Sequence, residues 1–389
     1  MKKILSPFMA LLPLLLLGQT TAPAPDQVPL PDGLYTQITT ESGIVVCELF
    51  YKKTPMTVAH YVGLAEGTVG PRKGEQFFEG LKWFRVEANF VIQGGDHAQG
   101  SGGGGDGRVT EPSFPDEIVP GLRHDGPGTL QMANAGPDTN GSQYCLMITD
   151  QTGLNYDHTV FGKVVRGLDL LTKFKVGDTM HVKILRVGKE AEAYHPTQES
   201  FDKLVASARR YTAPKVAGPD TFLDDPDNII GVGGRGSNFL QIKLANFERF
   251  TGERIMARVF AHTPADAVGG GEKEESFLKA LQQKLGVNEH GALVVFFQDQ
   301  NKWLIRIAPG SQKNFLAGPM KKDGTRDPAD AKPTLDDAIT AFMTTNTSST
   351  RWRATIAPPG AATASAPATA TTPATTPGRR GRGGAAAPR

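Results

Sequence analysis

The sequence predicts a mainly β N-terminal domain, a closed antiparallel eight-stranded barrel with two helices, followed by a smaller α/β C-terminal domain. Three observations lead to this prediction. Residues 77–165 consist of short apolar runs broken by Gly, Pro, Asn and Asp, a pattern typical of antiparallel barrels, and they lie within a domain predicted over 34–190. Helical and strand patterns alternate over residues 228–350, as in α/β domains. The length of 389 residues suits two moderate domains with linkers.

The first 22 residues have the pattern of a secretory signal peptide. Lys2 and Lys3 precede the apolar run 8–17, which ends in small and polar residues. This run is too short to span a bilayer comfortably, and no later segment approaches the roughly 20 apolar residues that a membrane helix needs. We therefore expect an exported protein of the periplasm or extracellular space, with no stable membrane span after signal cleavage. Retention of residues 1–22 as an anchor is the alternative. Residues 23–33 are a Pro-rich spacer.

The predicted barrel begins with a hairpin and a helix. Residues 35–39 and 44–50 are two β-rich runs around a Glu-Ser-Gly turn, which is a hairpin signal. Thr54 as N-cap and Pro55 at the first helical position then start a helix, in which apolar side chains follow at helical spacing until Gly67.

The rest of the barrel follows from short strands and one more helix. Residues 77–165 contain the strands, and a second helix over 168–174 precedes a last strand over 182–187. Residues 191–227 are predicted to be a linker with one helix, because 197–210 carries a single apolar stripe at helical spacing before a Pro/Asp-rich run.

The C-terminal domain is predicted over residues 228–350. Its expected elements are, in order, a helix over 239–251, a strand over 254–262, a helix over 273–285, strands over 292–298 and 302–307, and a helix over 334–343. From residue 351 to residue 389, Ala, Thr and Pro dominate and an Arg/Gly run follows, so this tail is predicted to be disordered.

The composition argues against several classes of partner. The charge is nearly balanced, with 42 Lys and Arg against 40 Asp and Glu, so we expect no nucleic-acid partner. The Gly-rich runs 102–105 and 231–236 lack the context of a phosphate or dinucleotide loop. Asp224, Asp225 and Asp227 are interpreted as a solvated loop rather than a cation site. The sequence therefore predicts no metal and no cofactor.

Three blocks of sequence carry the functional signal. The first joins residues 83–86, Trp-Phe-Arg-Val, to residues 89–96, Asn-Phe-Val-Ile-Gln-Gly-Gly-Asp. The second is residues 126–143, and the third is residues 158–162, His-Thr-Val-Phe-Gly. In this order and at this spacing the blocks resemble the signature of cyclophilin-type peptidyl-prolyl isomerases, over residues 34–187. The resemblance implies a barrel enzyme that isomerises X-Pro bonds.

Isomerisation makes modest chemical demands on a site. Rotation of a peptide bond must overcome a barrier of roughly 18–20 kcal/mol that arises from amide resonance. No covalent bond breaks, so the site needs only to bind the twisted amide better than either planar form. Arg85 is the predicted catalytic residue, because a guanidinium is always charged and can donate to the prolyl nitrogen or hold the substrate carbonyl. A surface ion pair is the alternative role for this arginine.

The resemblance also implies which residues bind the substrate. Some of these residues form the wall, floor, edge and rim of the proline pocket, and others orient the substrate backbone and the catalytic arginine. The full set is Phe90, Val91, Gln93, Ala133, Asn134, Gln143, Cys145, Leu154 and His158. Phe90 and Leu154 match the apolar wall, and Gln93 and Gln143 match the orienting amides. Main-chain groups of Asn134 would pair with the peptide.

Some positions depart from the family pattern. Val91, Cys145 and Gly153 stand where the family usually carries Met, Phe and Trp. An open floor and a missing aromatic rim imply weak cyclosporin binding, since a lost aromatic wall costs on the order of 1–3 kcal/mol of apolar contact. Cys47 occupies another usually aromatic position. The two cysteines either pair after export or remain as small buried thiols, and we favour the thiols.

The C-terminal domain resembles, more loosely, the TPM domains of bacterial envelope and thylakoid proteins, through residues 247–255, 290–297 and 302–307. The function expected for the whole chain is isomerisation of X-Pro bonds in unfolded or folding exported polypeptides, which assists their folding. Two alternatives remain open. One is a Pro-peptide-binding chaperone or scaffold with weak or no catalysis, and the other places the main activity in the C-terminal domain.

Overall fold

The computed structural model describes residues 29–97, 113–213, 221–227, 229 and 236–311. All of them lie in the first of the two compact units into which the chain divides, 1–353 and 354–389. The predicted signal peptide, the Gly-rich run 102–105, the helix over 334–343 and the predicted tail lie outside the described residues. No helix in the described part of the chain combines the length and the apolar character that crossing a membrane requires.

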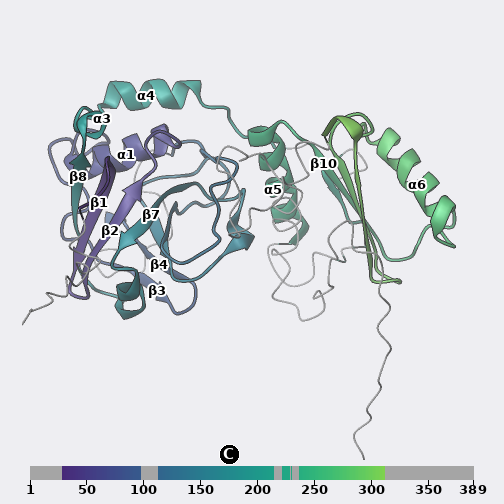
Figure 1. The fold of residues 1–389 in the computed structure, drawn as a ribbon, viewed down its shortest axis with the longest axis horizontal. Helices are drawn as coiled ribbons and strands as arrows, with labels where there is room; N and C mark the ends of the chain where they lie inside the picture. The colour runs from purple at the N-terminus through teal and green to yellow at the C-terminus, as the bar shows by residue number, and fades with distance from the viewer. Residues whose placement is uncertain (1–28, 98–112, 214–220, 228, 230–235, 312–389) are drawn as a thin grey trace, which may run out of the picture. The chain divides into compact units, whose positions relative to one another are not determined.

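The N-terminal domain is an eight-stranded antiparallel sheet that curves around an apolar core (Figure 1). The strand order is β3-β4-β6-β5-β7-β2-β1-β8. The bounds of the strands are β1 (Gly33–Thr40), β2 (Gly43–Leu49), β3 (Arg85–Glu87), β4 (Val91–Gly94), β5 (Thr129–Met132), β6 (Tyr144–Met147), β7 (Val160–Arg166) and β8 (His181–Val187). The predicted hairpin is confirmed by β1 and β2, which pair from Tyr35↔Glu48 to Thr40↔Gly43.

The prediction of a closed barrel was wrong, because the sheet is open between its edge strands β3 and β8. Within the described residues only one isolated bridge, Lys82↔Thr179, links the segments that precede these edges. Trp83 N–H donates to the Asp178 carbonyl at 3.0 Å beside this bridge. The physical reason lies in β3, which is three residues long and leaves too little strand for a continuous ladder with β8.

Helix α1 (Pro55–Glu66) begins and ends as predicted, but its N-terminus is capped differently. The Thr54 hydroxyl makes no cap bond to the helix and instead donates to the Phe50 carbonyl at 3.2 Å. The Glu117 carboxylate accepts from the backbone N–H groups of Met56 and Thr57 at 3.1 and 2.8 Å. An acceptor distant in sequence therefore satisfies two of the first helical donors.

The other helices of this domain within the described residues are short: η1 (Thr152–Leu154), η2 (Leu168–Lys173), α3 (Lys189–Glu192) and α4 (Gln198–Ser207). The second predicted helix is η2, which is a 3-10 helix. The helix predicted inside the linker is α4, which begins with a capping box between Thr197 and Ser200. Its Phe201 ring lies 5.1 Å from the His60 ring, so α4 packs back onto α1.

The C-terminal region contains a four-stranded sheet with a helix on each face (Figure 1). Its strands are β9 (Leu223–Asp224), β10 (Ile255–Phe260), β11 (Ala292–Phe297) and β12 (Lys302–Ile307), and its helices are α5 (Gly236–Thr251) and α6 (Gly271–Lys284). β9, β10 and β11 run parallel, and β12 pairs with β11 as an antiparallel hairpin.

The period of two along the strands explains the layers of this region. Ala292, Val294 and Phe296 pack in the apolar cluster that contains the α5 side chains, and the intervening Leu293 and Val295 pack in the cluster that contains the α6 side chains. Both faces of β11 are therefore buried, as expected of a strand inside an α/β sheet.

Candidate active site

A chain of hydrogen bonds runs from a buried carboxylate to an arginine on β3. Strand register places Arg85 opposite Gln93 and Gln93 opposite Cys145. Arg85 Nη1 donates to Gln93 Oε1 at 3.0 Å, and Gln93 Nε2 donates to Gln143 Oε1 at 2.8 Å. Gln143 Nε2 then donates to Asp96 Oδ2 at 2.5 Å. Because Asp96 accepts from the Gln143 amide nitrogen, the Gln143 oxygen faces Gln93, and the Gln93 oxygen is left to accept from Arg85.

The guanidinium of Arg85 is held on two further sides. Its Nε donates to Glu87 Oε1 at 2.7 Å, and its carbon lies 5.3 Å from the centre of the Phe90 ring. The surface ion pair considered as an alternative role is therefore present, and it does not exclude the first role. The Arg85 side chain is 41 % exposed, so it can meet a ligand. These bonds use only part of its five N–H donors.

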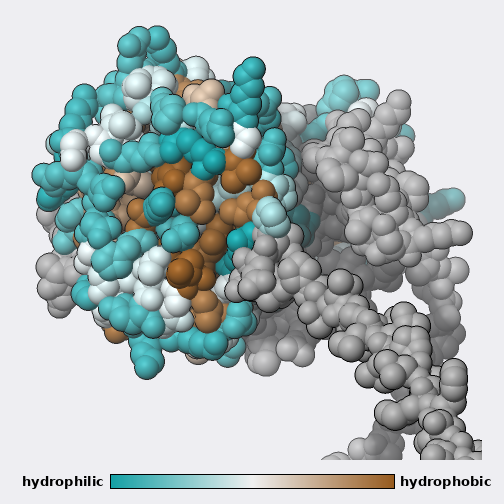
Figure 2. Space-filling view, turned by 60° about the vertical axis from the view of Figure 1, so that its left-hand side comes forward, coloured by the Kyte–Doolittle hydropathy of each residue, from teal (hydrophilic) through white to brown (hydrophobic). Residues whose placement is uncertain are grey.

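An apolar cluster lies on strands β4 and β6, and β4 also carries Gln93 of the hydrogen-bond chain. Val91, Cys145 and Met147 are buried in it. Phe90, Ala133 and Leu154 are partly buried against them. Six residues that are separated by up to 64 positions in the sequence thus form one apolar cluster, and only Met147 among them was not predicted. Figure 2 shows apolar residues gathered on one face of this domain, framed by hydrophilic ones.

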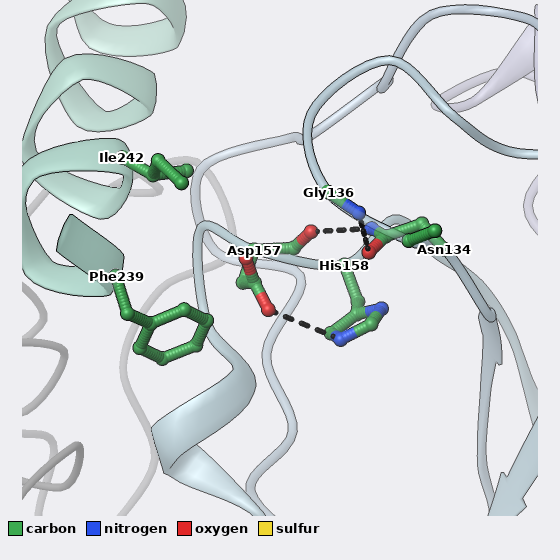
Figure 3. Close-up of a pocket in the computed structure, with 7 residues that line it drawn as sticks. Asn134, Gly136, Asp157, His158, Phe239 and Ile242 are labelled. Carbon is green, nitrogen blue, oxygen red and sulfur yellow. Dashed lines mark hydrogen bonds and ion pairs between the residues drawn. The ribbon is translucent and has the colours of Figure 1, made fainter. Parts of the chain in front are cut away.

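Asn134 and His158 form a rim whose side chains are already bonded within the protein (Figure 3). Asn134 Nδ2 donates to the Asp157 carbonyl at 2.8 Å, and Gly136 N–H donates to Asn134 Oδ1 at 3.2 Å. The His158 ring lies 3.1 Å from the Met132 carbonyl through Nδ1 and 3.1 Å from the Asp157 carboxylate through Nε2. The rim is therefore preorganised before any ligand arrives.

Both cysteines are free, buried thiols. Burial raises the pKa of Cys47, and it raises the pKa of Cys145 from 9.0 to about 12 although the Arg85 charge opposes the shift. The favoured interpretation of two small thiols in the core is the one that the structure shows. Cys145 is 4 % exposed and belongs to the same buried apolar cluster as Val91 and Met147.

The structure brings the predicted site residues together and adds one that the sequence analysis overlooked. Asp96 belongs to the first motif, but no role was predicted for it; its carboxylate has no exposed surface and accepts from Gln143. A carboxylate directly after Gln-Gly-Gly was the only signal in the sequence. Among the described residues no group of three or more His, Cys, Asp or Glu side chains is arranged to hold a metal ion.

A family model, two curated proteins and a solved structure are similar to the N-terminal part of this chain. The model of the family "Cyclophilin type peptidyl-prolyl cis-trans isomerase/CLD" matches residues 35–189. The chain is 38% identical over 149 residues to the human "Peptidyl-prolyl cis-trans isomerase-like 1", which covers 38% of this chain and 82% of that relative. It is 36% identical over 145 residues to "Peptidyl-prolyl cis-trans isomerase CYP18-2" of Arabidopsis thaliana, covering 37% and 82% respectively. A solved cyclophilin-type isomerase of Cryptosporidium parvum is similar at 28% identity, covering 40% of this chain and 98% of that one, with a TM-score of 0.34.

Proposed function

The chain belongs to the cyclophilin-type peptidyl-prolyl cis-trans isomerases, and from this premise we propose that it isomerises X-Pro bonds in exported polypeptides and so assists their folding. The enzyme class follows from the family. The export and the folding role are the parts that we add. X-Pro isomerisation takes tens to hundreds of seconds without a catalyst, which is slow enough to limit folding.

The observation that carries the proposal is the Arg85 guanidinium fixed beside the apolar cluster. As the amide twists, resonance is lost and the lone pair of the prolyl nitrogen becomes a hydrogen-bond acceptor. A preorganised charged donor stabilises that state more than the planar ground states. The apolar surface of Phe90 and Leu154 would hold the proline ring while the rest of the peptide rotates.

Export is supported by the order of charge, apolar run and small residues within residues 1–22. The test is expression of the full chain in a bacterium, followed by fractionation and intact mass measurement. The proposal expects a chain in the periplasm or medium that lacks about its first 22 residues. A full-length chain confined to the cytoplasm would refute the export part and leave the enzyme class untouched.

The folding role has a separate test. The full-length protein is added to a reporter protein whose refolding is limited by a non-native X-Pro isomer. We expect the slow refolding phase to accelerate in proportion to enzyme concentration, and Arg85→Ala to remove that acceleration. A chaperone or scaffold without catalysis, the alternative function, would raise the yield of refolded reporter but leave the rate of the slow phase unchanged.

A further inference from the structure

Helix α5 of the C-terminal region contributes to a pocket on the rim of the candidate active site (Figure 3). The pocket has a volume of about 310 Å³. Two apolar side chains of α5, Phe239 and Ile242, line one side of the pocket. Loop residues around the rim line the other side: Asn134, Ala135, Gly136, Asp157 and His158.

The position of α5 follows from polar contacts along one helical face. Lys243 Nζ donates to the Gly153 carbonyl, and Asn246 Nδ2 donates to the Tyr156 carbonyl at 3.0 Å. Arg249 Nη2 donates to Asp138 Oδ1 at 2.7 Å. Residues three and four apart share a helical face, so the face that makes these contacts continues toward the N-terminus of α5 through Ile242 and Phe239.

These contacts are buried, which favours a single position of the helix. The Arg249 and Asp138 side chains are 7% and 14% exposed, and the neighbouring Asp116 side chain is fully buried 4.0 Å from Arg249. The Phe247 ring packs edge-on against the Tyr156 ring at 5.0 Å. Separation of α5 from the rim would leave the buried carboxylates of Asp116 and Asp138 without the Arg249 cation. An unpaired buried charge is strongly destabilising, so this separation has a high free-energy cost.

The Phe239 ring is oriented by the same helix. Lys243 Nζ lies 5.2 Å from the centre of this ring while it bonds to the Gly153 carbonyl. Gly153 has no side chain, so the long lysine side chain can reach its backbone. The ring is thereby fixed over the rim as an apolar wall.

The pocket is continuous with the proline site through shared residues. His158 and Asn134 line the pocket, and Ala133, next to Asn134, belongs to the apolar cluster and donates its N–H to the Gln143 carbonyl at 3.0 Å. A polypeptide that places its proline against Phe90 and runs along the Asn134 main chain reaches the pocket within a few residues, because an extended chain advances about 3.3 Å per residue.

We infer that Phe239 and Ile242 form the outer wall of an extended substrate site, which takes an aromatic or large aliphatic side chain of the polypeptide next to the X-Pro dipeptide. The inference rests on the proposed isomerase function and assigns part of its substrate specificity to the C-terminal region. Aromatic and aliphatic side chains fit because the α5 wall is apolar, and the opposite wall consists largely of backbone and of polar groups that are already paired.

The test compares two kinds of peptide substrate with the full-length protein by exchange NMR. One is a blocked Ala-Pro dipeptide, and the other is a series of longer peptides with Phe or Gly at each position flanking Ala-Pro. For the wild type, kcat/KM should rise with Phe at one flanking position. Phe239→Ala should reduce kcat/KM for that peptide about tenfold and leave the blocked dipeptide unchanged.

Phe277→Ala provides the matched control, because Phe277 is a partly buried phenylalanine of α6 in the other apolar cluster of the same sheet. It should leave both peptides unchanged. If Phe239→Ala destabilises the chain, Ile242→Ser supplies a second variant, with the same selective loss expected. Equal kcat/KM for Phe and Gly at every flanking position in the wild type, with normal turnover of the dipeptide, would overturn this inference alone. Absence of turnover for both peptides would overturn the isomerase function itself.

Discussion

The Arg85 guanidinium donates to the Gln93 side-chain oxygen at 3.0 Å, and that amide is oriented from behind by Gln143 and the buried Asp96. The catalytic geometry is therefore supported by groups that need not touch the substrate. A guanidinium on an open strand edge would sample many rotamers, and each bond in this chain removes some of that freedom before substrate binds.

The first prediction concerns Gln143, in the middle of the hydrogen-bond chain from Asp96 to Arg85. Gln143→Leu keeps the volume of the side chain but removes the donor to Asp96 and the acceptor for Gln93. We expect kcat/KM for an Ala-Pro peptide to fall by about tenfold or more, because Arg85 loses its orientation. The free energy of unfolding should fall by about 1–3 kcal/mol, since a buried carboxylate loses a partner. Unchanged kcat/KM in a folded variant would show that the chain does not position the arginine.

The second prediction concerns the thiols. The pKa of Cys145 is raised from 9.0 to about 12, so its thiolate fraction near pH 8 is about a thousandfold lower than that of an exposed thiol. Iodoacetamide should therefore label neither cysteine in the native protein within the time that labels both in denaturant. Intact mass of the denatured, unreduced chain should show two alkylated thiols. A mass two hydrogens lighter, with no labelling, would instead demonstrate a disulfide.

The third prediction concerns the buried ion pair of α5. Arg249→Met removes the cation between Asp116 and Asp138, and we expect a loss of about 3–5 kcal/mol in the stability of the docked helix. Amide hydrogen exchange in α5 measures that loss directly. Arg254→Met is the control, since its ion pair with Glu248 is 49% and 28% exposed and contributes only about 0–1 kcal/mol. Similar exchange rates in the two variants would contradict the argument.

The fourth prediction is a pH dependence. Burial against Phe114 and Phe201 lowers the pKa of His60 from 6.5 to about 3. Between those values the unfolded chain binds a proton that the folded chain does not bind, so the free energy of unfolding falls as the pH falls below 6.5.

His60→Phe removes this dependence and keeps an aromatic ring. From pH 7 to pH 5 the wild type should lose about 2 kcal/mol more of unfolding free energy than the variant, as measured by urea denaturation. The comparison separates the contribution of His60 from that of Asp116. The raised pKa of Asp116, about 6, makes the free energy of unfolding rise as the pH falls, and it does so equally in both proteins. Parallel pH curves would mean that His60 is not buried as the structure shows.

Much of the N-terminal domain was predictable because its signals are local or lie in long motifs. Pro55 and Gly67 bound α1 as expected, and the residues matched to the site do converge on β3, β4 and β6. Capping of α1 by Glu117 was not predictable, since the two segments meet only through the fold. The sheet is open because β3 is only three residues long, and the strand propensities of single residues do not determine the length of a strand.

The contribution of α5 to the rim was equally beyond the sequence. Arg249 and Asp138 lie 111 positions apart, and nothing in the pattern around either one indicates the other as a partner. Gly153 was predicted to remove an aromatic wall, and in the structure its carbonyl accepts from Lys243. A missing side chain is visible in a sequence, but the group that approaches in its place is not.

The central claim is that a fixed guanidinium accelerates rotation about the X-Pro bond. The most direct measurement is the exchange rate between the cis and trans forms of an Ala-Pro peptide, by NMR, with the full-length wild type, Arg85→Lys and Arg85→Ala. We predict that Arg85→Ala lowers kcat/KM by about 10²–10³-fold and that Arg85→Lys recovers little of it, because an ammonium lacks the planar fork that bonds Gln93 and Glu87 together. Exchange as fast with Arg85→Ala as with the wild type would contradict the claim.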